Sequence, residues 1–83
     1  MKKYKLMRID WYDAETDSGW LNLEEVQKET MPLVHSIGLV IKQNRKEIFI
    51  THSISTSECN SYLVVPRSMV KEMTVIKIFE FEA

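Results

Sequence analysis

The chain has 83 residues, a net charge of −1 and one cysteine, Cys59. Domains typically run to about 100–150 residues, so this length predicts a single domain over 1–83. A lone cysteine excludes a disulfide within the chain, and two histidines without a CxxC spacing predict no metal site and no cofactor. The near-neutral charge excludes a chain-wide attraction to nucleic acid.

A domain this small buries only about 60% of the surface of its unfolded chain. Small folds compensate with disulfides, a metal or self-association, and the composition disfavours the first two. We therefore expect a homo-oligomer. No apolar run reaches the ~20 residues of a membrane span and no export signal is recognised, so we expect a cytoplasmic protein without a membrane partner.

The first predicted strand is Lys2–Asp13, and its apolar pattern changes face along its length. Leu6 belongs to one face, whereas Met7 and Ile9 follow the other alternation. Such a switch predicts a β-bulge near Leu6 and Met7, or a strand partly buried on both sides.

A polar loop, Asp13–Gly19, comes next and is flanked by Trp11 and Trp20. Two roles are open for the tryptophans. They can pack against each other or against the end of the sheet, or they can form an aromatic wall that stacks on a base or ring.

A short helix is predicted after Trp20. Asn22 with Glu25 three positions later resembles a capping box, and Pro32 stops the helix. About two helical turns are too few to be stable alone, so we expect the helix to pack on the sheet as a lid over one end.

Four strands complete the predicted sheet, with Gly38 in the first of them and a tight or 3₁₀ turn at Pro66–Arg67. Gly38 predicts a sharp bend or a close backbone approach. Antiparallel pairing of the first and last strands would bring N-terminal lysines to C-terminal glutamates. The predicted strands are Leu33–Lys42, Lys46–Ser55, Ser61–Pro66 and Lys71–Glu82.

These elements predict a mainly β fold (α+β by count). A five-stranded, bent antiparallel sheet with a short turn before the last strand is the plan of an SH3-like or Sm-like small barrel. The helix is then an insertion after the first strand. An OB-like barrel is the second candidate, although its helix normally lies between the third and fourth strands.

No arrangement of residues predicts catalysis. A nucleophile needs an adjacent base and a third group to orient it, and the spacing of His35, His52 and Cys59 brings none of them together. The expected activity is therefore binding rather than an enzymatic reaction.

The turns Gln43–Lys46 and Thr56–Ser61 are expected to protrude at one end of the sheet. Arginine and amide side chains there suit phosphates and base edges, although a hairpin tip that is simply polar is the plainer alternative. The candidate ligand-binding residues are Trp11, Trp20, Asn44, Arg45, Lys46, Ser57, Asn60 and Arg67.

Several short motifs carry a resemblance over nearly the whole chain: WYDA with a following GW (Trp11–Ala14, Gly19–Trp20), SIGLVIK (Ser36–Lys42), SIS (Ser53–Ser55) and VVPR (Val64–Arg67). With them the chain resembles a family of short phage and prophage proteins. More distantly it is similar to Sm-like small barrels of phage origin, which form rings and can bind RNA. It lacks the RNA-binding motifs of Sm-like proteins, so no RNA-contacting residue is carried over.

The resemblance implies a protein that acts in the cytoplasm of an infected or lysogenic bacterial host. Small phage oligomers commonly counter host defence, and some sequester cyclic nucleotide signals without cleaving them. We therefore expect a non-enzymatic oligomer that sequesters a nucleotide-like ligand. Sm-like binding of short RNA is one alternative, and protein interaction by strand addition without a nucleotide is another.

Overall fold

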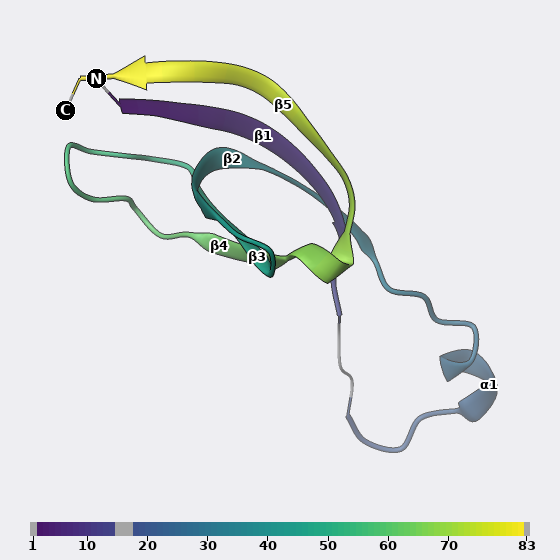
Figure 1. Cartoon of the computed structure of the whole chain (residues 1–83). Helices are drawn as coiled ribbons and strands as arrows, with labels where there is room; N and C mark the ends of the chain where they lie inside the picture. The colour runs from purple at the N-terminus through teal and green to yellow at the C-terminus, as the bar shows by residue number, and fades with distance from the viewer. Residues whose placement is uncertain (1, 15–17, 83) are drawn as a thin grey trace.

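The computed structural model describes residues 2–14 and 18–82, which form a five-stranded antiparallel sheet and one short helix (Figure 1). The mainly β class predicted from the sequence is confirmed. The elements in chain order are β1 (Lys2–Tyr12), α1 (Leu23–Val26), β2 (Leu33–Gln43), β3 (Glu47–Thr51), β4 (Leu63–Pro66), the 3₁₀ helix η1 (Arg67–Met69) and β5 (Val70–Phe81).

The strands lie in the order β4-β3-β2-β1-β5. β2, β3 and β4 follow one another as antiparallel neighbours, and η1 then carries the chain to β5, which pairs with the opposite side of β1. The predicted 3₁₀ turn is thereby confirmed. Within the described part of the chain β4 and β5 are the two end strands, so closure into a barrel stays a prediction.

Pairing of β1 with β5 confirms two expectations. The register shifts between Leu6 and Met7, which is where the apolar side chains change from one face of the strand to the other. The predicted β-bulge is therefore present at this position. Lys3 lies opposite Glu80, and its Nζ is 3.3 Å from a Glu80 carboxylate oxygen.

The core lies on one face of the sheet, beneath the second half of β1 and beneath β3 and β4. Ile9, Ile48 and Val65 are completely buried. Fully burying an aliphatic side chain contributes about 1.5–3 kcal/mol, so these few residues supply much of the stabilisation. The buried cluster consists of Met7, Ile9, Trp11, Ile48, Ile50 and Val65.

The molecule is elongated, with extents of 55 × 23 × 19 Å. At one end the first half of β1 and the second half of β5 run out together as a two-stranded ribbon, and at the other end the segment with α1 projects away from the sheet (Figure 1). Two parts of the chain therefore lie beyond the core.

The helix is capped as predicted, but it does not cover the sheet. The Asn22 side-chain oxygen accepts hydrogen bonds from the backbone N–H groups of Glu24 (2.9 Å) and Glu25 (3.3 Å). The helix is only four residues long and buries none of them. The segment that contains α1 connects Tyr12 at the end of β1 to Leu33 at the start of β2. These two residues are the last pair of the β1–β2 ladder, so the segment begins beyond the core. The expectation of a lid is wrong.

β3 is shorter than predicted, ending at Thr51 instead of Ser55. The Thr51 hydroxyl is almost completely buried and donates a 2.7 Å hydrogen bond to the Ser61 carbonyl, which draws the returning chain across the end of the strand. No helix in the described residues is long and apolar enough to cross a membrane.

Candidate functional site

A recessed surface with polar lining lies where β2 extends beyond the end of β3. β2 pairs with β3 only from Leu39 onward, opposite Thr51, whereas its earlier residues pair with β1. The chain between Thr51 and Leu63 leaves the sheet and returns, and a cavity of about 290 Å³ lies in the gap. We call this cavity the β2 notch. It is lined by His35, Ser36, Ile37, Ile50, His52, Ser61, Tyr62 and Leu63.

Gly38 allows β2 and β3 to lie close together next to the notch. A Cβ atom at this position would lie 3.0 Å from the Thr51 carbonyl oxygen and 3.1 Å from the Ile50 Cβ. Such distances are below ordinary van der Waals contact, so β3 lies against β2 here only because residue 38 has no side chain. The close backbone approach predicted for Gly38 is confirmed.

Ser61 forms the opposite wall in an uncommon backbone conformation. Its φ is +54°, the left-handed region that costs a residue with a Cβ roughly 1–2 kcal/mol. The Thr51 hydroxyl holds the Ser61 carbonyl in place, so the surrounding structure fixes this conformation. Backbone strain of this kind is concentrated at ligand sites and switch regions.

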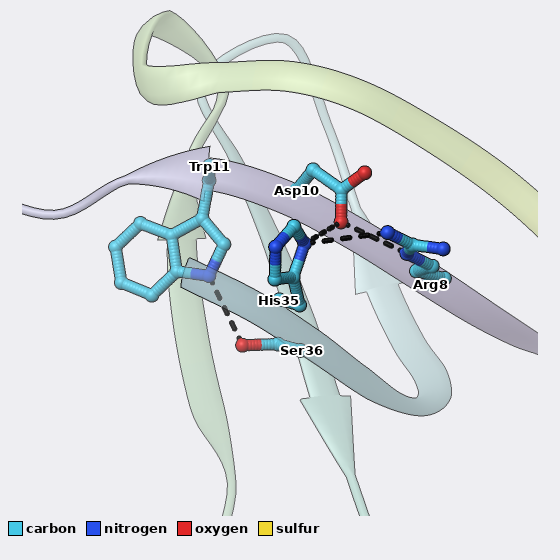
Figure 2. A network of polar contacts seen from close by, with 5 residues as sticks. All are labelled: Arg8, Asp10, Trp11, His35 and Ser36. Atoms are coloured by element: carbon cyan, nitrogen blue, oxygen red, sulfur yellow. Dashed lines mark hydrogen bonds and ion pairs between the residues drawn. The ribbon is translucent and has the colours of Figure 1, made fainter. Parts of the chain in front are cut away.

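A polar cluster next to the notch consists of Arg8 and Asp10 on β1 and His35 on β2 (Figure 2). Asp10 and His35 are cross-strand partners, and the Asp10 Oδ1 lies 2.5 Å from His35 Nδ1 and 3.0 Å from Arg8 Nε. The hydrogen bond from His35, with the Arg8 guanidinium, lowers the pKa of Asp10 from its ordinary 3.8 despite partial desolvation. The carboxylate is therefore ionised at neutral pH.

An ionised carboxylate accepts hydrogen bonds only, so the proton in the short contact belongs to His35 Nδ1. The approach of Arg8 Nη2 to the same nitrogen, at 3.4 Å, is then a close contact and not a hydrogen bond. Asp10 thus fixes the tautomer and orientation of the ring. His35 Nε2 forms no hydrogen bond with the described residues and is available for a ligand.

Tyr62 and His52 are exposed residues of the lining. Tyr62 is 62% exposed, and its ring packs against Phe49, with 5.8 Å between the ring centroids. His52 lies just past the end of β3 and is also exposed. The notch therefore combines an aromatic surface with imidazole and hydroxyl groups, a combination suited to binding a polar ligand with a ring.

The structure separates the two tryptophans of the predicted site. Trp11 is 7% exposed and lies in the core, where its indole N–H donates a 3.0 Å hydrogen bond to the Ser36 hydroxyl (Figure 2). Trp20 is fully exposed on the projecting segment. A buried ring offers no open face to a ligand and the two do not form one wall, so neither belongs to the candidate site.

Asn44 and Arg67 come together, but their polar groups are occupied by the chain itself. The Asn44 side chain accepts hydrogen bonds from the N–H groups of Lys46 and Glu47, at 2.8 and 2.9 Å. Arg67 donates to the Asn44 carbonyl (2.7 Å) and to the Gln43 side chain (3.0 Å). These contacts tie η1 to the β2–β3 turn. Arg45 and Lys46 are exposed at the same turn.

Ser57 and Asn60 lie elsewhere, in the long β3–β4 connection. Arg67 adjoins Lys46 at the start of β3, whereas Ser57 and Asn60 follow its end. The expectation that both turns protrude together is wrong, because consecutive turns of an antiparallel meander emerge at opposite ends of the sheet. The predicted residues thus form no single site.

Sequence reasoning missed His35, His52 and Tyr62 as neighbours. The available signal was that both histidines interrupt isoleucine-rich strands, at positions where a polar ring needs a partner or water. Their convergence with Tyr62 depends on where β3 stops, which the alternating pattern does not show because it continues through Ile54.

Other chemistry has less support in the described residues. Within 2–14 and 18–82, no group of three or more His, Cys, Asp or Glu side chains is placed to hold a metal ion. Cys59 is an exposed free thiol. No protein-family model, curated protein or solved structure matches this chain, so the resemblance to phage proteins stays a prediction.

Proposed function

We propose that this protein binds a nucleotide-like ligand in the β2 notch without converting it. The observation that carries the proposal is the composition of this one cavity of about 290 Å³, whose lining includes two histidines, Ser61 and the exposed Tyr62. The proposed site thus replaces the turn tips expected from the sequence.

Each part of a nucleotide has a matching group at the notch. A base can stack on Tyr62, and base–aromatic stacking contributes about 1–3 kcal/mol per base in single-stranded nucleic acid complexes. A phosphate can contact the Arg8 guanidinium at the border, and the His35 Nε2 lone pair can accept a hydrogen bond from a sugar hydroxyl or a base N–H, since these side chains are 50% and 53% exposed. Ser61 and His52 remain for sugar or base-edge contacts.

The size of the notch limits the ligand. Small-molecule sites usually enclose about 300–1,000 Å³, so this cavity fits a mononucleotide or one half of a larger nucleotide. A cyclic dinucleotide would then occupy the notches of two copies. Sequestration of a host immune-signalling cyclic nucleotide, in the cytoplasm of an infected or lysogenic bacterium, is the most specific form of the proposal.

The hydrogen bonds of the site favour binding over turnover. A nucleophilic mechanism needs a serine or cysteine within reach of the base. Ser36, which follows His35 on β2, uses its hydroxyl to accept the Trp11 indole N–H, and within the described residues no hydrogen bond joins the side chain of Ser36, Ser61 or Cys59 to His35 or His52. The site holds polar groups in fixed directions, as binding requires.

Thermal unfolding with added ligands tests the proposal, because a ligand that prefers the folded state raises the Tm. The probes are cyclic dinucleotides and trinucleotides, ADP-ribose and short oligoribonucleotides. We expect a rise with a nucleotide that is lost in Tyr62→Ala and in His35→Ala. Trp20→Ala is the matched control, since it removes an exposed aromatic ring that does not line the notch.

The outcomes separate the functional classes. A rise with oligoribonucleotides only, falling steeply with salt, would instead indicate the Sm-like alternative, which a net charge of −1 disfavours. Equal loss of the shift in Trp20→Ala would place the site elsewhere. No rise with any probe would overturn nucleotide binding and leave protein interaction by strand addition as the function to test.

A further inference from the structure

The helix α1 is left uncovered by the rest of the chain. Every described residue of the segment 18–33 is exposed, and the α1 residues Leu23 and Val26 are 76% and 45% exposed. These two side chains lie on the same side of the helix, because residues three apart are neighbours on a helical surface. A helix of four residues is too short to be stable alone, so it needs a surface to pack against.

The charges of α1 are opposite in sign to those of most of the chain. Glu24 and Glu25 lie on either side of Leu23 and Val26 around the helix. In the sequence, the segment 13–32 has six acidic residues and one lysine, whereas the remainder has ten basic and six acidic residues. Acidic charge is therefore concentrated around α1, and basic charge is concentrated elsewhere.

A cavity of about 240 Å³ with a basic lining lies where β1 and β2 separate. The β1–β2 ladder ends at the pair of Leu6 and Leu39. Beyond this pair β1 continues beside β5, and β2 continues beside β3. We call this cavity the lysine fork. It is lined by Lys3, Lys5, Val40, Ile41, Lys42 and Gln43.

The three lysines of the fork come from both of its strands. Lys3 and Lys5 belong to β1 and Lys42 belongs to β2, and all three are exposed. Lys3 is paired with Glu80, and the Lys42 Nζ lies 5.1 Å from the centroid of the Phe49 ring. Lys5 forms no ion pair within the described residues. The fork thus combines positive charge from two strands with two half-buried apolar residues of β2.

We propose that two copies of this chain associate by placing α1 of each copy in the lysine fork of the other. Leu23 and Val26 then cover the apolar residues of the fork, while Glu24 and Glu25 face its lysines. Complementary charges of this kind select a partner and fix the orientation of an interface. A second copy supplies both the acidic and the basic surface, so no other protein is required.

α1 cannot reach the fork of its own chain. It follows Tyr12 at the end of β1, whereas the fork opens at Leu6, about 20 Å away along the strand at roughly 3.3 Å per residue. Figure 1 shows α1 projecting away from the sheet at this end. In a second copy that runs in the opposite direction the two ends are exchanged, so each α1 meets the fork of the other chain. Such a twofold pair makes the contact twice and closes at a dimer.

Sedimentation equilibrium at micromolar concentration tests the proposal, and its result does not depend on any nucleotide. We expect a wild-type dimer. The acidic reversal E24K/E25K and the basic reversal K5E/K42E should each raise the dimer Kd at least about tenfold, because like charges then face each other. Added NaCl should also weaken the wild-type dimer, since salt screens exposed charges.

An equimolar mixture of these two variants tests the exchange of α1 between chains. Each variant alone places like charges at both contacts. In a mixed pair, the basic α1 of E24K/E25K meets the acidic fork of K5E/K42E, and the two unchanged surfaces meet at the other contact. We therefore expect a dimer with one chain of each kind, and its formation would also show that both variants are folded.

Two controls are matched to the charge reversals. K71E/K77E reverses two exposed lysines of β5 that do not line the fork. Trp20→Ala removes an exposed side chain that precedes the Asn22 cap and is not part of α1. Both should leave the dimer Kd unchanged. Leu23→Ala should weaken the dimer without affecting the fold of the single chain, because this side chain is exposed there.

A wild-type monomer at these concentrations would overturn the inference. A dimer whose Kd is unchanged in E24K/E25K and in K5E/K42E would overturn it too, because the copies would then associate through another surface. Equal weakening by either control would contradict the assignment to α1 and the fork. So would a mixture that stays monomeric while circular dichroism shows both variants to be folded.

Discussion

Polar residues lie at both ends of β3, but they differ in whether their side chains have hydrogen-bond partners within the chain. At its start, Asn44 and Arg67 direct their polar groups to the backbone and side chains of the same turn. At its end, His52 and Tyr62 line a cavity, and no side-chain hydrogen bond is formed by either residue within the described part of the chain. A polar residue that is satisfied internally supports the fold, whereas one left open at a concave surface is available to a ligand.

The turn at the start of β3 shows how far composition alone can indicate a binding site. Asn-Arg-Lys with a later arginine has the composition of a phosphate site, but composition does not show where the hydrogen bonds go. Asn44 closes its own turn, as asparagine often does. We call the contacts of Asn44 and Arg67 at the start of β3 the clasp, whereas the end of β3 is the candidate binding site.

The largest effect is expected from Gly38→Ala, which acts next to the notch. The new methyl group would meet the Thr51 carbonyl oxygen at 3.0 Å and would push β3 away from β2. We expect a loss of about 3 kcal/mol in the free energy of unfolding, the upper end of the range for overpacking. Urea denaturation measures it, and a change below experimental error would contradict the close approach.

A smaller loss in the free energy of unfolding is expected from Arg67→Ala, which removes the Arg67 contacts of the clasp. Two side-chain hydrogen bonds are removed at an exposed position, so we expect about 1–2 kcal/mol. Nucleotide affinity should stay unchanged, because Arg67 and the notch are at opposite ends of β3. Arg45→Ala is the matched control at the same turn. Loss of ligand binding in Arg67→Ala without loss of stability would restore the turn tip as the site.

Asp10→Asn should alter the dependence of stability on pH. The pKa of Asp10 is lowered in the folded state by His35 and Arg8, so the carboxylate contributes stability that is present above its ordinary, unfolded pKa of 3.8. This contribution is lost as the pH falls through the lower folded value. The free energy of unfolding, measured by urea denaturation, should therefore fall less steeply between neutral and acidic pH for Asp10→Asn than for the wild type. Identical pH profiles would contradict the contact between Asp10 and His35.

The smallest effect is expected from Trp20→Ala. This side chain is fully exposed, and substitutions at such positions usually change stability by less than about 0.5 kcal/mol. Trp11→Phe is the informative partner, because it removes the buried indole N–H that bonds to Ser36. Thermal unfolding should show a clearly larger loss of Tm for Trp11→Phe than for Trp20→Ala. A large loss of Tm for Trp20→Ala would show that the Trp20 side chain packs against the rest of the chain.

The sequence predicted what depends on local pattern. The bulge at Leu6 and Met7 follows from a change of alternation, the Asn22 cap from its residue type and spacing, and the contact at Gly38 from a glycine inside a strand. The antiparallel pairing of β1 and β5 follows from their complementary charges.

The sequence did not predict the notch, because its walls depend on long-range contacts. The alternating pattern of β3 continues to Ile54, yet the strand ends where the Thr51 hydroxyl bonds to the Ser61 carbonyl. The conformation of Ser61 has no marker in its residue type. The exposed helix was likewise unexpected, since a capping pattern shows where a helix starts and not what it packs against.

The central claim is that ligands bind at the end of β3 and not at its start. Titration of isotope-labelled protein with a nucleotide that raises its Tm, followed by amide chemical shifts, tests it most directly. We expect the amide shifts to change at His35–Ile37, at Ile50–His52 and at Ser61–Leu63, with Asn44–Lys46 and Arg67 unchanged. Shifts concentrated at Asn44–Lys46 and Arg67, with the notch unchanged, would contradict it.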